Sequence, residues 1–166
     1  MNKQVWIEKA LGLGIQEFEI YQSTTVEKEM TWFQGQMDTL VSSKVTGTSI
    51  RGIVDGKMAN MALEEIDDSM CETVLKSLIE QAHIISNEET DSLRKPEPIE
   101  YVKKDVTWNM ASTEYVKDIL QSLEAKILAY DPRVIQVGYL GYSQGSGSRS
   151  IVNSLGMDVQ DADEMQ

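Results

Sequence analysis

Alternating apolar and polar residues on both sides of Asp55 and Gly56 form the clearest pattern in this chain. An Asp-Gly pair between two apolar-rich runs is the strongest short-range signal for a β-hairpin, because a two-residue turn requires positive φ at its central residues. If residues 48–63 close in this way, one face is the more apolar, as in an antiparallel sheet covered on one side. That face carries Ile50, Gly52, Val54, Ala59 and Met61, and the other carries Ser49, Arg51, Met58, Asn60 and Ala62, together with Ile53.

Further strands are predicted on the N-terminal side of this hairpin. Residues 18–20 alternate apolar with acidic side chains, which is the period of a half-buried strand. Residues 26–33 and 37–43 are rich in strand-forming side chains and flank residues 34–36, a Gln-Gly-Gln sequence that predicts a tight connection.

Three segments have the spacing of amphipathic helices. Asn2 can cap the first, which ends at a pair of glycines. Residues 69–85 form the second, where Ser69 and Glu72 match a capping box. Residues 112–130 form the third, which an Asp-Pro pair ends. The apolar stripe of the second helix is Met70, Val74, Leu78, Ala82 and Ile85, widened by Cys71, Leu75 and Ile79, and that of the third is Val116, Ile119, Leu120, Leu123 and Ile127.

A polar, proline-containing stretch at residues 87–111 predicts an internal connection. After the third helix, residues 134–142 predict a strand, residues 145–148 a Gly-Ser-Gly-Ser loop, and residues 149–154 the return strand. The polar tail at residues 161–166 is expected to be loose.

The order of elements is therefore helix, four strands, helix, connection, helix and two strands. Strands joined by short turns favour antiparallel pairing, so the predicted fold class is α+β, an antiparallel sheet with helices packed mainly on one face. At 166 residues the chain is long enough to bury a core.

Charge excludes one class of partner. The formal net charge is −12, and the basic residues are scattered, whereas duplex binding uses clustered Lys and Arg. We therefore predict no nucleic-acid surface. No apolar run approaches the length of a membrane span, and the N-terminus lacks the apolar core of a signal peptide, so we predict a soluble, cytoplasmic protein without a membrane partner.

Cys71 and His83 are the only cysteine and the only histidine. A zinc site needs three or four ligands, usually of these two types, so neither residue predicts one. Cys71 is expected to pack as a small apolar residue, and His83 to lie near a helix end, where a cation suits the dipole. The acidic residues at 64–68 and 88–91 lack the spacing of a calcium loop. Asp67 and Asp68 instead suit a helix start.

Gly141-Tyr-Ser-Gln-Gly145 matches the Gly-x-Ser-x-Gly nucleophile elbow, which would make Ser143 a nucleophile. The required order is Ser, acid, His, yet His83 lies upstream, and residues 145–148 are a poor helix start. We therefore interpret this segment as part of a hairpin, and residues 145–148 as its tip rather than a phosphate-binding loop, which would need a lysine.

The aromatic residues are expected to pack rather than to bind. In an alternating strand Tyr139 and Tyr142 point to opposite faces, so one of them could border a groove. The others in this group are Trp6, Trp32 and Trp108.

Residues 18–93 resemble the N-terminal domain of the TldD/PmbA (TldE) family, also called modulators of DNA gyrase. The resemblance rests on the hairpin Ile50-Arg-Gly-Ile-Val-Asp-Gly-Lys-Met-Ala59, on Asp67-Asp-Ser69 and on Glu80-Gln-Ala82, and it extends to Ile151-Val-Asn-Ser-Leu-Gly156. The strand lengths are closer to the PmbA (TldE) half. The resemblance implies that residues 1–166 are an N-terminal domain, and that a C-terminal domain absent from this chain completes the protein.

The resemblance implies a zinc metallopeptidase complex. In the TldD half, the C-terminal domain holds a His-Glu-x-x-x-His zinc motif that nothing in this sequence matches. No catalytic, cofactor-binding or metal residue is therefore assigned here, and zinc is expected in a partner subunit or in the missing domain. The implied partners are a TldD-like subunit or a second copy, and an extended or unfolded peptide.

Our leading hypothesis is the N-terminal, non-catalytic domain of a PmbA/TldE-like subunit, which helps to form the peptide cleft and the subunit interface. The alternative is a free-standing α+β module that binds a partner through a sheet edge. A serine hydrolase built on Ser143 is a distant third.

Overall fold

The computed structural model describes residues 1–64, 66–86, 89–98 and 111–165. Its chain divides into two compact units, each made of three segments. The first unit is Met1–Thr24, Thr46–Lys103 and Ser148–Asp161, and the second is Thr25–Val45, Lys104–Gly147 and Ala162–Gln166. No helix among the described residues is long and apolar enough to cross a membrane.

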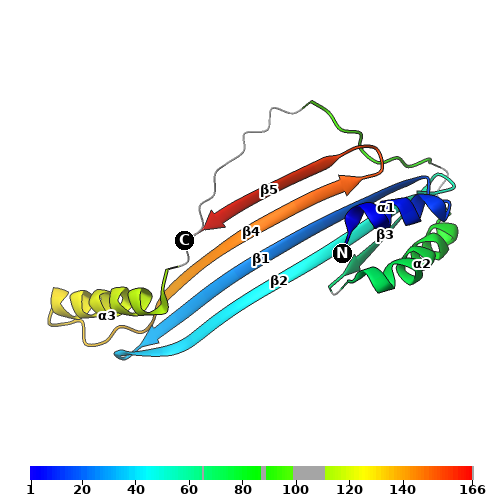
Figure 1. Ribbon diagram of the computed structural model, residues 1–166. Helices are drawn as coiled ribbons and strands as arrows, with labels where there is room; N and C mark the ends of the chain where they lie inside the picture. The colour runs from blue at the N-terminus through cyan, green and yellow to red at the C-terminus, as the bar shows by residue number, and fades with distance from the viewer. Residues whose placement is uncertain (65, 87–88, 99–110, 166) are drawn as a thin grey trace. The chain divides into compact units, whose positions relative to one another are not determined.

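The elements confirm the predicted α+β class, with five strands in the order β3-β2-β1-β4-β5 (Figure 1). In chain order they are α1 (Lys3–Gly12), β1 (Glu17–Phe33), β2 (Gln36–Val54), β3 (Lys57–Leu63), the 3-10 helix η1 (Asp68–Met70), α2 (Cys71–Ile84), α3 (Thr113–Tyr130), β4 (Leu140–Asn153) and β5 (Asp158–Met165).

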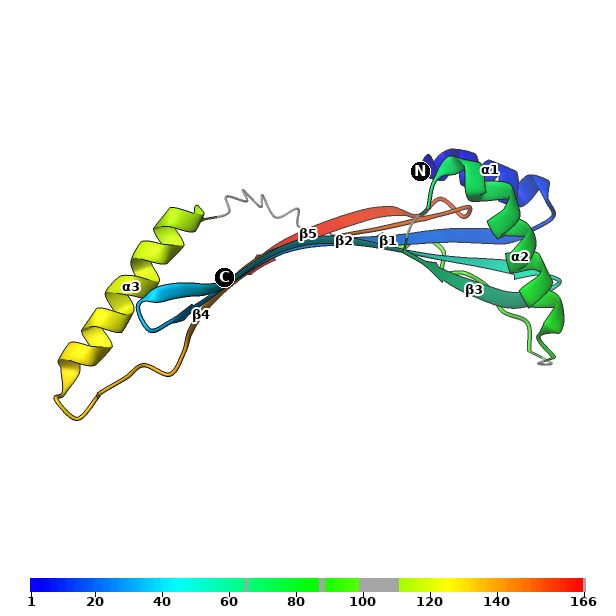
Figure 2. The same ribbon diagram turned by 90° about the horizontal axis from the view of Figure 1, so that it is seen from below.

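Helices α1 and α2 cover the same face of the sheet in the first unit (Figure 2). Phe18 and Ile20 of β1, both fully buried, point toward them. Gly52 of β2 allows this packing, because a Cβ there would lie 2.9 Å from side-chain atoms of both Ile15 and Leu78. The helical members of this core are Trp6, Ile7, Ala10, Cys71, Val74, Leu75, Leu78 and Ala82.

The β2–β3 hairpin closes as predicted. Asp55 and Gly56 have φ values of 50° and 73°, and Val54 pairs directly with Lys57 across the turn. The antiparallel register continues to Thr48 opposite Leu63. The predicted apolar face is the buried one, since Ile50, Val54 and Ala59 belong to the core and Met61 packs against it.

The start of the second helix differs from the prediction. The expected capping box of Ser69 and Glu72 is wrong, because η1 precedes α2 and Asp67 caps it by accepting a hydrogen bond from the backbone N–H of Ser69 at 2.7 Å. Donation from the Ser69 hydroxyl and N–H holds the pKa of Asp67 below its ordinary value. An aspartate two residues before a serine accepts locally and so competes with the serine for the capping role. At α1 the prediction is correct, since Asn2 accepts from Val5 N.

The second unit has its own small core. Met30 and Trp32 of β1 pack against Val116 and Leu120 of α3. Ser112 caps α3 by accepting from Tyr115 N at 3.1 Å. Met30 and Trp32 are two positions apart in β1, so both side chains lie on one face of the strand, the face that α3 covers in this unit.

Several strand predictions are wrong in detail. Among the described residues, three strands rather than four precede the second helix, because β1 and β2 are each a single long strand. Residues 134–139 are not a strand, since β4 begins at Leu140. Residues 145–148 are not a loop, and 149–154 is not a separate return strand, because β4 continues to Asn153.

Glycines explain why β4 continues through Gly-Ser-Gly-Ser. A Cβ on Gly145 would lie 3.2 Å from the carbonyl oxygen of Val26, and one on Gly147 would lie 2.6 Å from Asp163 Oδ1. Glycine in a strand marks close approach of neighbouring chain rather than a turn. The true turn follows Asn153, and the expected loose tail forms most of β5, an edge strand with acidic residues of the kind that protects sheet edges.

Candidate functional site

A groove of about 340 Å³ opens on the face of the first unit's sheet that no described helix covers. Its residues come from four strands, and most point away from the core because side chains alternate along a strand. They are Glu19 and Tyr21 of β1, Ser49 and Arg51 of β2, Met58 and Asn60 of β3, and Ile151 of β4.

The buried carboxylate of Glu19 holds Arg51, the one basic side chain that lines this groove. Glu19 is 1% exposed, and its Oε1 accepts from both Nε and Nη2 of Arg51, each at 2.6 Å. A buried charge is tolerated only when it is paired and hydrogen-bonded, and the Arg51 guanidinium satisfies that requirement for Glu19. The Arg51 side chain is 44% exposed, so its remaining N–H groups stay accessible.

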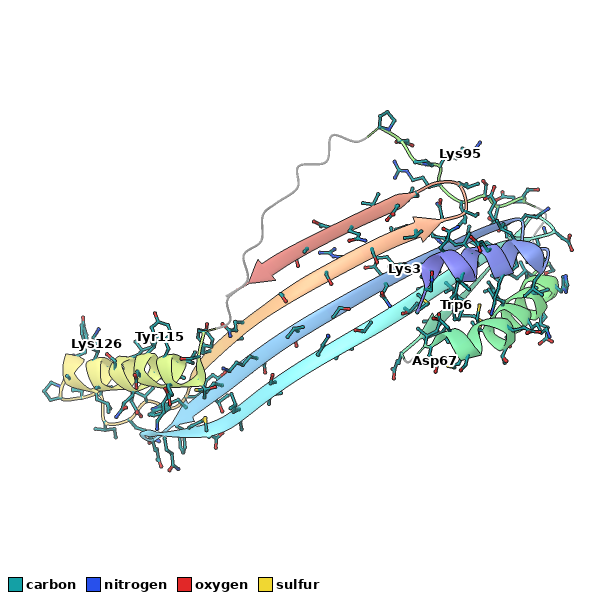
Figure 3. All side chains as sticks on the ribbon, viewed as in Figure 1. Lys3, Trp6, Asp67, Lys95, Tyr115 and Lys126 are labelled. Carbon is teal, nitrogen blue, oxygen red and sulfur yellow. The ribbon has the colours of Figure 1, made fainter. Side chains whose placement is uncertain are left out.

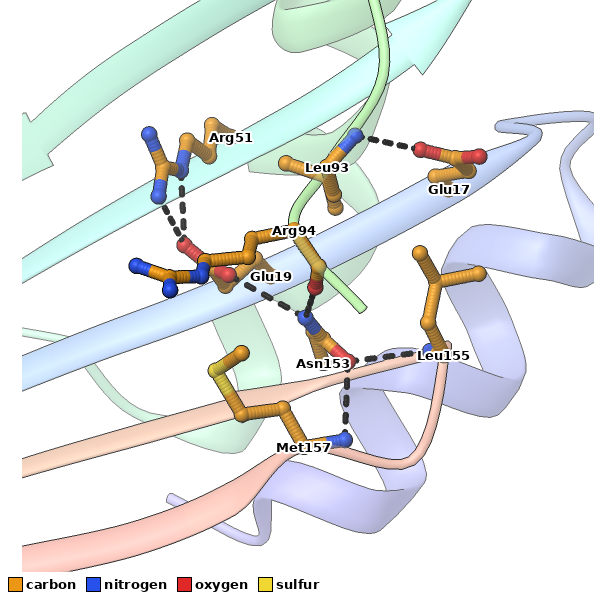
Figure 4. A network of polar contacts seen from close by, with 8 residues as sticks. All are labelled: Glu17, Glu19, Arg51, Leu93, Arg94, Asn153, Leu155 and Met157. Atoms are coloured by element: carbon orange, nitrogen blue, oxygen red, sulfur yellow. Dashed lines mark hydrogen bonds and ion pairs between the residues drawn. The ribbon is translucent and has the colours of Figure 1, made fainter. Parts of the chain in front are cut away.

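Asn153 completes the support of Glu19 (Figure 4). Its Nδ2 donates to Glu19 Oε2 at 3.2 Å and to the Arg94 carbonyl oxygen at 3.0 Å. Its Oδ1 accepts from the backbone N–H groups of Leu155 and Met157, both at 3.0 Å. One buried amide therefore joins the β4–β5 turn, the carboxylate and the segment that carries Arg94.

That segment crosses the end of the sheet and is held by a second carboxylate. Glu17 accepts from Leu93 N at 2.6 Å and from the Ser92 hydroxyl. Leu93 is buried. Residues 89–98 thus lie within the predicted connection at 87–111 and carry no helix or strand, while positions 87–88 and 99–110 lie outside the described residues.

The groove offers several uncommitted polar groups. Within the described part of the chain, Arg51 Nη1 and the side-chain polar groups of Tyr21, Ser49 and Asn60 have no hydrogen-bond partner. Because Glu19 balances the charge of Arg51, the groove suits neutral polar groups, such as the amides of a peptide backbone, better than a lone anion.

Cys71 and His83, the only residues that could supply a thiol or an imidazole, lie at opposite ends of α2. Cys71 is 1% exposed at the start of α2, where burial raises the pKa of its thiol, so it packs as predicted. His83 is in the last turn of α2 as predicted, and its Nε2 lies 3.6 Å from Asp55 Oδ2.

Two of the acidic residues considered as metal ligands, Asp68 and Asp91, have structural partners. Asp68 accepts from the backbone N–H of Asn2 at 2.8 Å and from the indole N–H of Trp6 at 2.9 Å, and these bonds hold the pKa of Asp68 below its ordinary value. Figure 3 marks Trp6 on α1 and Asp67 at the start of η1. Asp91 accepts from Met58 N. Positions 65 and 88 lie outside the described residues.

A zinc ion does not fit this part of the chain. Among the described residues, no three histidine, cysteine or acidic side chains are grouped so that they could share a metal ion. No chemical step is therefore assigned to zinc in this chain.

Ser143 lies inside β4 and is followed by more strand, so the turn that a nucleophile elbow needs is missing at this point. The interpretation of residues 141–145 as part of a hairpin is confirmed, because β4 pairs with β5 across the turn that follows Asn153, whereas the hairpin tip expected at residues 145–148 is wrong. Residues 145–148, in the same strand, do not form a phosphate-binding loop.

The aromatic predictions are largely confirmed. Trp6 and Trp32 are buried in the two cores. Tyr142 is partly buried and donates to Gln144 Oε1, whereas Tyr139 is 67% exposed, precedes β4 and borders a second hollow with Gly141. Trp108 lies outside the described residues.

Sequence reasoning missed Glu19 and the role of Asn153. Glu19 was treated only as the polar member of an alternating strand. A signal existed, because the other face of the predicted hairpin carried Arg51, the one basic side chain on that face. A cation among polar residues in the middle of a sheet requires a nearby acid.

Two family models match the chain. The model of the PmbA/TldA metallopeptidase domain 1 matches residues 18–86, and that of the PmbA/TldA metallopeptidase central domain matches residues 107–165. A comparison with curated proteins found no match.

Solved structures share the fold. TldE from Thermococcus kodakarensis matches with a TM-score of 0.81 and 18% identity over 98% of this chain. A candidate modulator of DNA gyrase from Bacteroides thetaiotaomicron matches with a TM-score of 0.75 and 18% identity over 97%, and one from Thermotoga maritima with 0.73 and 19% over 98%. The chain spans 37%, 38% and 36% of these three proteins, respectively. The two models together account for most of the chain, and it belongs to the PmbA/TldD metallopeptidase family.

Proposed function

We propose that this chain is the non-catalytic part of a PmbA/TldE-like subunit in a zinc metallopeptidase complex, where it helps to bind an extended peptide. A TldD-like subunit, or a domain beyond the described residues, would supply the zinc. The proposed role is cytoplasmic proteolysis, including the maturation of peptides, and the chain would contribute to the subunit interface.

The groove around Arg51 is the observation that carries this proposal. Its open groups are a guanidinium edge, a phenol, a hydroxyl and a carboxamide, spread over three strands. Such groups can hydrogen-bond to the carbonyl and N–H groups of an extended peptide without selecting one side chain. Because Glu19 pairs with Arg51 and is itself held by Asn153, peptide binding would not require the cation to be reorganised.

Peptide binding tests the groove directly. A fluorescein-labelled unfolded peptide is titrated with the chain, and fluorescence anisotropy gives the dissociation constant. We expect Tyr21→Phe combined with Asn60→Ala to weaken binding about tenfold, since each change removes one neutral hydrogen bond of about 0.5–1.5 kcal/mol. Tyr115→Phe, on the exposed face of α3, is the matched control and should bind normally. Equal affinity for all three proteins would contradict a peptide-binding groove.

The role in a complex needs a second assay. The whole protein is mixed with a TldD-like subunit, and peptide hydrolysis is measured with and without a zinc chelator. We expect chelator-sensitive hydrolysis that Asn60→Trp, which fills the groove, reduces. Hydrolysis that persists with chelator, or that proceeds equally without this subunit, would rule out the proposed role.

A further inference from the structure

A second hollow, of about 300 Å³, opens on the sheet of the second unit, and we call it the Tyr139 hollow. The odd-numbered residues of β1 that line it face away from α3, because the even-numbered Met30 and Trp32 pack against that helix. The odd-numbered residues that line the hollow are Glu29, Thr31, Tyr139, Gly141 and Ser143.

Two neighbouring strands bring these residues together. β1 and β4 are adjacent in the sheet and run in opposite directions (Figure 1). Gly145 of β4 lies beside Glu27 of β1, because a Cβ on Gly145 would lie 3.5 Å from Glu27 Cγ. In an antiparallel pair, residues two positions farther along face each other again, so Ser143 lies opposite Glu29. The other two strand residues of the hollow form the next pair on the same face.

Gly141 makes room for the side chain of Tyr139. A Cβ at position 141 would lie 2.5 Å from Tyr139 Oη and 3.1 Å from Tyr139 Cζ, so a larger residue there would displace the phenol. The phenol therefore lies across β4 at Gly141, yet Tyr139 is still 67% exposed. An aromatic ring that rests on a sheet and remains exposed is a platform on which a cation can stack.

The side chains of the Tyr139 hollow supply acceptors and negative charge. Glu29 is an exposed carboxylate that can only accept hydrogen bonds, and the exposed hydroxyl of Ser143 can also accept. The hydroxyl of Thr31 donates to the carboxylate of Asp38 at 3.3 Å, so a second negative charge lies at the border. None of the described residues that line the hollow is basic. Lys28 donates instead to the start of α3, on the other face of β1.

A guanidinium group fits this combination of groups. It is planar, so it can stack on an aromatic ring while two of its N–H groups bond to one carboxylate. Its remaining N–H groups can donate to hydroxyl oxygens, and its positive charge suits a chain with a net charge of −12. A volume of about 300 Å³ is at the lower end for small-molecule pockets, which suits one side chain better than a whole cofactor.

We propose that the Tyr139 hollow binds the side chain of an arginine in a peptide, with the guanidinium stacked on Tyr139 and paired with Glu29. That this arginine belongs to a peptide rests on the proposed function, whereas binding of the guanidinium itself does not. Among extended peptides, the chain would then favour those that contain an arginine. The site is separate from the groove around Arg51, so the two can fail independently.

NMR titration of the ¹⁵N-labelled chain with N-acetyl-L-arginine amide tests guanidinium binding directly, because this probe has no other charge. We expect saturable shifts of the backbone amide signals of Glu29 and Ser143, with a dissociation constant on the order of 1 mM. The citrulline derivative has the same shape without the charge, and it should cause no saturable shift. Equal binding of the two compounds, or no saturable shift with either, would overturn the proposal.

Two pairs of variants test the residues. Glu29→Gln should raise the dissociation constant of the arginine derivative about tenfold, because the charged partner is lost. Glu27→Gln is the matched control, since Glu27 is exposed on the same strand and face but does not line the hollow. Tyr139→Leu should also weaken binding, whereas Tyr139→Phe keeps the ring and should not. Circular dichroism checks the fold of each variant. Equal losses for Glu27→Gln and Glu29→Gln, or equal losses for the two Tyr139 variants, would contradict this site.

A peptide with one arginine and no lysine tests the natural ligand. Its fluorescein-labelled form is compared with the same peptide carrying citrulline at that position, by fluorescence anisotropy. We expect the arginine form to bind about fivefold more tightly or better, and Glu29→Gln to abolish this preference. Equal affinity of the two peptides would overturn the assignment of a peptide arginine. Loss of peptide binding in the groove variant Tyr21→Phe with Asn60→Ala, with binding of N-acetyl-L-arginine amide unchanged, would concern the groove alone.

Discussion

Replacing Asn153 with alanine is expected to lower the free energy of unfolding by about 4 kcal/mol, because it removes four hydrogen bonds from one buried site. Asn153 is 4% exposed. The N–H groups of Leu155 and Met157 lie in a partly exposed turn and can regain water, so each costs about 1 kcal/mol. The Glu19 oxygen is buried and charged, and with the Arg94 carbonyl it accounts for about 2 kcal/mol more.

Urea unfolding followed by circular dichroism measures this loss. With a slope of about 2 kcal/mol per molar urea, the midpoint should fall by about 2 M. Tryptophan fluorescence serves as a second probe, since coincident transitions are needed before one free energy describes the change.

A carboxylate at position 153 separates lost hydrogen bonds from electrostatics. Asn153→Asp keeps an acceptor for the turn but places a negative charge about 3 Å from Glu19. Mutual repulsion raises the folded-state pKa of this pair above its unfolded value. The penalty therefore appears as the pH rises above the unfolded pKa of about 4 and is absent below it.

Comparing the stabilities of Asn153→Ala and Asn153→Asp separates the effect of lost hydrogen bonds from that of charge repulsion. We expect Asn153→Asp to be less stable than Asn153→Ala at pH 7 and to recover below about pH 4 relative to it. A loss below about 1 kcal/mol for Asn153→Ala, together with no pH-dependent excess for Asn153→Asp, would refute the reasoning, because the site would then have to be solvated.

Three more predictions address the packing of the two units. Gly52→Ala should cost about 1–3 kcal/mol by overpacking the core beneath α2, measured by urea unfolding, while Gly12→Ala, with no atom within 4 Å of the new Cβ, should cost nothing. Glu124→Ala should cost about 2 kcal/mol and change the fluorescence of Trp32, whose indole N–H donates to the Glu124 carboxylate at 2.7 Å; an unchanged spectrum would contradict this contact. Hydrogen bonds from the backbone N–H of Asn2 and then from the Trp6 indole hold the folded-state pKa of Asp68 below 3.8. These bonds therefore stabilise the fold above that pH, and the stabilisation is lost as the pH falls through the folded-state pKa. The difference in melting temperature between the unaltered chain and Asp68→Asn should therefore vanish in acid, and a difference that persists there would contradict it.

The sequence correctly predicted those turns and helices whose conformation is determined by residues close together in the chain. Asp55 and Gly56 specify a turn, a turn specifies a register, and the register of β2 and β3 was therefore predictable residue by residue. Helix α3 was equally predictable from its cap at Ser112 and its apolar period. In both cases the residues that decide the conformation are neighbours in the sequence.

The errors arose where distant chain decides the conformation. Gly145 and Gly147 look like a loop because nothing nearby in the sequence shows that other strands approach them so closely. Residues 161–165 look loose because their sequence is mostly polar, yet a strand can be held by backbone bonds to its neighbour in the sheet. Ser69 failed as a cap because Asp67, two residues earlier, accepts from both its backbone N–H and its hydroxyl and so begins η1 there.

The short motifs that carry the family resemblance contain no catalytic residues, yet they position the candidate groove. Arg51 lies in the first stretch that carried the resemblance, and Asn153 lies in the last, 102 positions later in the sequence. Both bond to Glu19, and Ser154, next to Asn153, accepts from Phe18 N at 2.9 Å. These motifs therefore fix the register of β1 against β2 and β4, and with it the floor of the groove. Under the proposed function, a change in the groove-lining side chains without structural partners would alter which peptide binds without changing the fold.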